Sequence, residues 1–166
     1  MDNISVNDRY LHRLVQMLYD RESCPALDEY GSSIFGRPVE NTWRLFRYLT
    51  RFSVAGAWMW NPHTEMAEYS SVEVPTIEEF STFLFHEVTH GWCHFHNKDT
   101  NLGNYPTGVD EEQVCWDVSK LVCEFLGLTF HQKSADQSHQ FHKLVSAGDL
   151  EGLAVLMKEL PAHHQM

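Results

Sequence analysis

The sequence predicts a single α+β domain that is mostly helical and carries a small antiparallel or mixed sheet. The chain has 166 residues, and its 43% hydrophobic content, with five Trp and ten Phe, is enough for a packed core. Apolar residues recur at helical spacing through most of the chain, whereas residues 52–60 and 67–74 have strand-like character. We expect the domain to span residues 1–166, with its core in 41–130 and a helical pair at 136–160.

The first fifty residues predict a helix, a loop and a second helix. The segment 4–21 places a row of apolar side chains on one side of a helix: Ile4, Leu11, Leu14, Val15 and Leu18. The segment 22–41 contains four residues that favour turns, Pro25, Gly31, Gly36 and Pro38. We therefore expect a loop with short ordered pieces there. Aromatic residues at helical spacing then predict a helix from about 41 to 50.

The centre of the chain predicts a strand pair and a helix. The strand at 52–60 is expected to turn at Asn61-Pro62-His63 and to pair with 67–74. Thr76 and Glu79 have the spacing of a capping box, which predicts the start of a helix.

Three more helices are expected after this one. A loop at 97–108, with Gly108 at its end, precedes Asp110 and Gln113, which have the spacing of a second capping box. The segments 136–147 and 149–160 predict two short helices, joined at Ala147-Gly148-Asp149.

The pentapeptide at 86–90, His-Glu-Val-Thr-His, is the most informative feature of the sequence. No Pro or Gly interrupts residues 76–90, so the motif should lie in a helix, where residues four apart share one face. His86 and His90 could therefore bind one metal ion, and Glu87 could take a proton from a metal-bound water. The alternative is an amphipathic helix whose histidines are only solvated.

A third metal ligand is expected in the helix that follows Asp110. Glu111 and Glu112 lie about 100° apart around a helix, so at most one of them should face the metal. Glu111 points into an apolar arc, where an ionised carboxylate would need a partner. Cys115 and Ser119 stand three and seven residues after Glu112, and small residues there would let two helices approach closely. We predict Glu112 as the ligand and keep Glu111 as the alternative; both could also be an acidic first turn favoured by the helix dipole.

Residues 76 to about 126 resemble the gluzincin-type HExxH zinc metallopeptidases, in particular the ImmA-type enzymes of phages and plasmids. The resemblance implies a minimal zincin-like fold in which His86, His90 and Glu112 bind Zn²⁺ and Glu87 is the catalytic base. It also implies an edge strand that binds the substrate backbone, for which 67–74 is the candidate, although this stretch could equally be an ordinary edge or central strand.

The sequence departs from the gluzincin pattern at one position. The acid usually found four residues after the glutamate ligand is replaced by Trp116. Asp117 or a backbone carbonyl could instead accept a hydrogen bond from the first histidine.

A metzincin arrangement is the competing subclass. It would use His96, six residues after His90, as the third ligand. The glycine that permits the necessary turn is replaced by Cys93, and a side chain there makes such a turn costly. The His-Gly-Pro segment of the SprT-like proteins is absent.

Composition limits the compartment and the partners. No segment is apolar over the length that spans a bilayer, and the N-terminus lacks the order of a signal peptide. Four cysteines without Cys-x-x-Cys spacing are typical of reduced thiols in the cytoplasm. A net charge of −11 argues against a nucleic-acid partner and against a regulator with its own DNA-binding segment.

These observations predict a cytoplasmic zinc-dependent endopeptidase that hydrolyses a protein or peptide substrate. The alternative is a non-catalytic binding or inhibitor module stabilised by zinc, although a purely structural site would not need Glu87. Four residues are candidates to stabilise an oxyanion, and the histidines among them could equally be ordinary surface residues: Tyr105, His131, His139 and His142.

Overall fold

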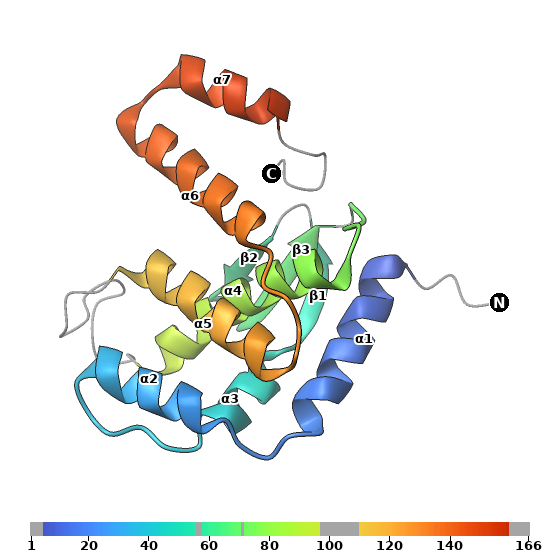
Figure 1. The fold of residues 1–166 in the computed structure, drawn as a ribbon, viewed down its shortest axis with the longest axis vertical. Helices are drawn as coiled ribbons and strands as arrows, with labels where there is room; N and C mark the ends of the chain where they lie inside the picture. The colour runs from blue at the N-terminus through green and yellow to red at the C-terminus, as the bar shows by residue number, and fades with distance from the viewer. Residues whose placement is uncertain (1–4, 56–57, 71, 97–109, 160–166) are drawn as a thin grey trace.

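The computed structural model describes residues 5–55, 58–70, 72–96 and 110–159. Within these residues the chain forms seven helices and three short strands (Figure 1). The prediction of a mostly helical α+β domain with a small sheet is confirmed. In chain order the elements are α1 (Val6–Tyr19), α2 (Pro25–Phe35), α3 (Thr42–Leu49), β1 (Phe52–Ala55), β2 (Met59–Asn61), β3 (Met66–Ser70), α4 (Ile77–His96), α5 (Glu111–Phe125), α6 (Gln132–Ala147) and α7 (Leu150–Glu159).

The sheet is mixed, with β3 between β1 and β2. β1 runs parallel to β3 and β2 runs antiparallel to it. The prediction of one strand over 52–60 is therefore wrong, because a single strand cannot pair with β3 in both senses. The predicted turn is present: the Asn61 side-chain oxygen accepts a hydrogen bond from the His63 backbone N–H at 2.9 Å.

Helix α4 is the centre of the structure. Thr76 accepts a hydrogen bond from the Glu79 backbone N–H at 3.2 Å, as its predicted capping role requires. The helix packs against α5, the sheet, α1 and α3, and most of its side chains are buried. Phe80, Leu84 and Trp92 are fully buried members of the core. Because this helix is held on several sides, the motif at 86–90 stands on a rigid support.

The prediction of a loop over 22–41 is wrong for residues 25–35, which form α2. Pro25 occupies the first turn of the helix, where its missing N–H costs nothing, and Gly36 ends the helix with a φ of 67°. A Cβ at Gly31 would lie 2.8 Å from Val39 Cγ2, so this glycine allows close packing. The residues that suggested turns thus start the helix, end it and let it pack.

The predicted N-terminal and C-terminal helices are present. Helix α1 begins after Ser5, whose hydroxyl accepts from the Asp8 N–H, while Ile4 lies outside the described residues. α3 lies within the predicted 41–50. α6 begins four residues before its predicted start, and Gly148, with a φ of 68°, separates it from α7.

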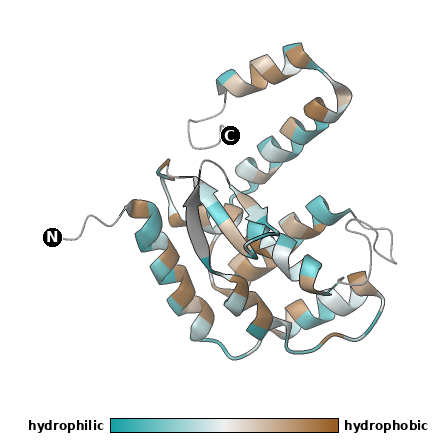
Figure 2. Ribbon diagram, turned by 180° about the vertical axis from the view of Figure 1, so that it is seen from behind, coloured by the Kyte–Doolittle hydropathy of each residue, from teal (hydrophilic) through white to brown (hydrophobic). Residues whose placement is uncertain are grey.

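Helices α6 and α7 form a hairpin that projects from the body of the protein (Figure 1). Figure 2 shows α6 changing from hydrophilic at its start, beside the body, to hydrophobic at its end, where it meets α7. None of the described helices has the length and apolar character needed to cross a membrane.

Candidate metal centre

Helix α4 presents His86 and His90 on one face, as the spacing predicts. The centroids of the two imidazole rings are 5.0 Å apart and the rings are nearly perpendicular. His86 is buried, with a relative exposure of 5%, whereas His90 is partly buried. The alternative of two solvated surface histidines is therefore wrong.

Glu112, at the start of α5, lies opposite these two rings. Its Oε2 is 3.2 Å from His86 Nε2 and its Oε1 is 3.0 Å from His90 Nε2. Burial alone would raise the pKa of Glu112, but the two imidazoles outweigh it and hold the pKa well below its usual range. The Oε2 contact is close without hydrogen-bond geometry, since this buried oxygen has no hydrogen-bond partner within the described part of the chain. The structure thus brings together the three side chains predicted as metal ligands.

Glu111 contacts the other edge of His90. Its Oε2 lies 2.9 Å from His90 Nδ1, so the imidazole lies between two adjacent glutamates. Burial would lower the pKa of His90, but Glu111 and Glu112 together raise it to about 11. The partner that an ionised Glu111 needs is therefore His90. A carboxylate on Nδ1 fixes the orientation of an imidazole whose Nε2 binds a metal.

Glu87, the predicted base, lines the same pocket as the two histidines. Its Oε1 is 4.0 Å from His86 Nε2, and only 13% of its side chain is exposed. Burial raises the pKa of Glu87, against the opposing effect of His86 and His90. A carboxyl group with a raised pKa exchanges protons more readily near neutral pH than an exposed one.

Cys115, one turn after Glu112 on α5, is a further potential ligand. The ligand atoms of His86, His90 and Cys115 lie within 4.8 Å of one another, so this group could hold a metal ion. Burial raises the pKa of the Cys115 thiol well above its usual range, and a hydrogen bond with Cys93 acts in the same direction. From the sequence, Cys115 was only a small residue that allows close helix packing. Its position three residues after Glu112 was the signal that could have indicated a donor on the same helical face.

The environment of His86 differs from the expected one. The ring of Trp116 lies against the imidazole, with centroids 3.9 Å apart and an angle of 41° between the ring planes. His86 Nδ1 is buried and has no hydrogen-bond partner among the described residues. Neither predicted acceptor is therefore in place. Asp117 instead accepts from Tyr30 Oη at 3.1 Å and from the Gln113 amide at 2.9 Å.

The second predicted capping box is also wrong. Asp110 is the N-cap residue of α5, but its side chain makes no capping hydrogen bond. The amide of Gln113 contacts Asp117, one turn further along the helix.

The metzincin arrangement is contradicted by the path of α4. The helix continues without a turn through Cys93 to His96. The His96 ring packs against Phe35 and Trp92, with centroid distances of 5.1 and 5.0 Å. Burial there lowers the pKa of His96 to about 4. His96 therefore belongs to the packing of α4 on α2.

A pocket of about 390 Å³ opens beside the two histidines. Apolar residues form much of its wall: Trp58, Met59, Trp60, Pro62, Phe83 and Trp116. The pocket is therefore bounded by β2, α4 and α5, and Ser138 and His142 extend it to α6. Because β3 has a strand on each side, the prediction that 67–74 is the edge strand beside the site is wrong. The strand at this edge is β2.

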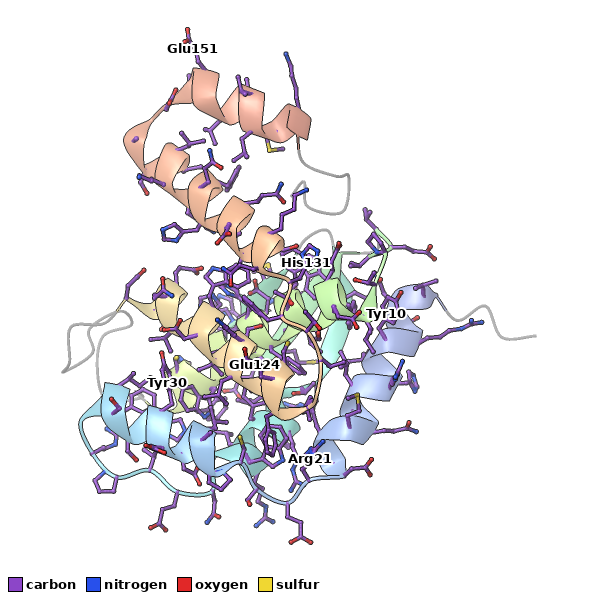
Figure 3. The ribbon with its side chains drawn as sticks, in the orientation of Figure 1. Tyr10, Arg21, Tyr30, Glu124, His131 and Glu151 are labelled. Atoms are coloured by element: carbon purple, nitrogen blue, oxygen red, sulfur yellow. The ribbon has the colours of Figure 1, made fainter. Side chains whose placement is uncertain are left out.

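Of the predicted oxyanion candidates, His142 lines the pocket. His131 instead lies where the chain enters α6 (Figure 3) and forms an ion pair with Glu79 at 3.1 Å. His139 is exposed and is not among the residues that line the pocket. Tyr105 and the predicted loop at 97–108 lie outside the described residues.

Comparison with known proteins gives no relative from which a role could be transferred. No protein-family model matches the chain, and no curated protein and no solved structure matches it.

Proposed function

We propose that the protein is a zinc-dependent endopeptidase of the gluzincin type, with a minimal zincin-like fold. The observation that carries the proposal is the placement of one carboxylate, Glu112, within 3.2 Å of the Nε2 atoms of both His86 and His90. Glu87 lies beside them, and the pocket is large enough to admit a substrate side chain.

The donor set fits a zinc ion. Two imidazole nitrogens and one carboxylate oxygen form a three-residue ligand set typical of catalytic zinc sites, which keep a fourth position for water. His86, His90 and Glu112 would hold the metal. The contact of Glu111 with His90 Nδ1 supports this role, because it leaves Nε2 facing Glu112.

Zinc bound at this site supplies a Lewis acid and lowers the pKa of a bound water. Glu87 takes the proton of the attacking water and delivers it to the nitrogen of the departing amine. The buried position of Glu87 limits its solvation and favours this proton exchange. His142 faces the pocket from α6 and can donate a hydrogen bond to a developing oxyanion.

A protein segment is the substrate class that suits this pocket. β2 is an edge strand beside the site, and an extended peptide can add to such an edge through backbone hydrogen bonds. The aromatic part of the wall favours an apolar side chain next to the scissile bond. The net charge of −11 opposes a nucleic-acid substrate, and the four free cysteines suit the cytoplasm.

The variant Glu87→Gln tests this function. It should bind zinc in the same amount as the wild type but should no longer hydrolyse a proteome-derived peptide library. Mass spectrometry of the library measures the hydrolysis. His139→Gln, on the exposed side of α6, is the matched control and should retain both properties. Loss of zinc from Glu87→Gln, or wild-type cleavage by it, would refute the role of Glu87.

A second function is favoured by Cys115. If a thiolate joins the two imidazoles and Glu112, the site has four protein ligands and serves a structural purpose. The protein would then be a zinc-stabilised binding or inhibitor module. In that case chelation lowers the melting temperature strongly, while the peptide library stays intact in every variant, including those without Cys115.

A further inference from the structure

We infer that Cys115 is a fourth protein ligand that closes the metal site at rest, so that hydrolysis requires its sulfur to leave. The inference rests on the proposed function, because it concerns the metal held by His86 and His90. It adds a regulatory ligand that the gluzincin pattern does not contain.

The first support is position. Cys115 follows Glu112 by three residues on α5, so both side chains lie on the same face of this helix. Its sulfur and the ligand atoms of the two histidines lie within 4.8 Å of one another. Nitrogen and sulfur ligands of a tetrahedral zinc ion are separated by about 3.5 Å, so the three groups are close enough to converge on one ion after a small adjustment of their side chains.

The second support is the surroundings of the sulfur. Cys115 is fully buried between α5 and α4, and its thiol is in hydrogen-bond contact with Cys93. Movement of this sulfur toward the histidines would exchange its contact with Cys93 for a bond to the metal. The group contains neither Cys93 nor Glu112, so the Glu112 carboxylate, which contacts both imidazoles, has to adjust together with the sulfur to complete a four-ligand site.

The closed and open states of the site differ in what Cys115 binds: its sulfur is bonded to the metal in the closed state and to a proton in the open state. When the site closes, the S–H bond of Cys115 breaks, its proton passes to solvent, and a sulfur–metal bond forms. His86, His90, Glu112 and Cys115 then fill four positions, and no position remains for water. When the site opens, the sulfur–metal bond breaks, the sulfur regains a proton from solvent, and a water takes the vacated position. No oxidant or reductant takes part.

X-ray absorption at the zinc edge of the zinc-loaded full chain tests the inference directly. The wild type should show one sulfur neighbour at about 2.3 Å beside nitrogen and oxygen neighbours at about 2.0 Å. Cys115→Ala should lose the sulfur neighbour. Cys123→Ala is the matched control, since Cys123 is buried on the same helix but contacts Ser81 at 3.6 Å, and it should keep the sulfur neighbour. Cys115→Ser, which keeps the size of the side chain, replaces the alanine variant if circular dichroism shows that the latter does not fold.

Hydrolysis provides the second measurement. Cys115→Ala should cleave the peptide library several-fold faster than the wild type, because its fourth position is always open. Only nitrogen and oxygen neighbours in the wild type, or a sulfur neighbour that persists in Cys115→Ala, would overturn the inference.

The two proposals fail in different ways. A sulfur neighbour without cleavage in any variant supports the ligand role of Cys115 and contradicts the peptidase. Cleavage by a wild type that shows no sulfur neighbour supports the peptidase and contradicts the ligand role of Cys115.

Discussion

Glu111 contacts His90 Nδ1 at 2.9 Å, on the edge of the ring opposite to the one that Glu112 contacts. The two glutamates are neighbours on α5, yet both reach the same imidazole. The contact of Glu111 with His90 holds the ring with its Nε2 facing Glu112, so in the proposed zinc site Glu111 would orient this ligand.

Removing Glu111 should weaken zinc binding without abolishing it. Spacing alone predicts that Glu111→Ala leaves zinc binding largely intact, but the contact with His90 changes this expectation. We expect zinc affinity to fall about 10- to 100-fold, the usual effect of losing a carboxylate that orients a histidine ligand. Competition with a chelating dye measures the affinity. Glu124→Ala, an exposed acid at the other end of α5, is the control and should bind as tightly as the wild type. An unchanged zinc affinity in Glu111→Ala would contradict the role of Glu111 in orienting His90.

Gly91 allows the sheet to pack on α4 beside the site. A Cβ at Gly91 would lie 2.5 Å from the ring of Trp60 on β2. Gly91→Ala should therefore lower the free energy of unfolding by about 1–3 kcal/mol, as overpacking typically does. Urea denaturation measures this value. In a Trp60→Ala background the same change should become neutral or stabilising, because the clash is gone and alanine favours helix. An equal loss in both backgrounds would show that the ring is not the cause.

His96 should make the protein less stable in mild acid. Burial lowers its pKa to about 4 in the folded state, from 6.5 in the unfolded chain, so protons bind preferentially to the unfolded chain. The stability that comes from a neutral His96 is present above about pH 6.5 and is lost as the pH falls toward about 4. We expect a loss of about 1–2 kcal/mol, after allowance for solvent screening of a partly exposed ring.

Urea denaturation at pH 7 and pH 5 measures this effect. His96→Gln should lose less stability between these pH values than the wild type. The exposed His139, changed to Gln, should leave the dependence on pH unaltered. A wild-type pH dependence in His96→Gln would contradict the assignment.

Asp28 on α2 caps the neighbouring helix α3. The N-cap residue of α3, Asn41, makes no side-chain capping bond, and Asp28 Oδ1 accepts instead from the Thr42 N–H at 2.9 Å. Asp28→Ala should lower the free energy of unfolding by about 1–2 kcal/mol, as the loss of a cap does. Thermal and urea denaturation measure the change. Glu29→Ala, exposed and adjacent, should have little effect, and equal destabilisation of the two variants would refute the capping role.

The sequence could predict which side chains share a face of α4 and of α5, because this depends only on local helical geometry. Four-residue spacing places His86 and His90 together, and a helix starting near Asp110 brings Glu112 to its first turn. The contact of Glu111 could not be predicted, since it depends on how the two helices sit against each other. An imidazole also offers two nitrogens on different edges, so two adjacent acids can reach it even though they lie about 100° apart around the helix.

Long-range packing explains the features that the sequence did not reveal. The close approach of Gly31 to Val39 and Trp92 is visible only in the folded protein, so the signals around it suggested a loop. The order of the strands is set by pairing partners, and local pattern does not distinguish a central strand from an edge. His142 reaches the pocket from a helix more than fifty residues after His86, and no spacing rule connects the two.

The zinc content of the purified protein tests the central claim most directly. Elemental analysis should find one zinc per wild-type chain and almost none in His86→Ala or Glu112→Ala, while His96→Ala, on the side of α4 that packs on α2, retains the metal. A wild type without zinc, or a full equivalent of zinc in His86→Ala or Glu112→Ala, would contradict the account.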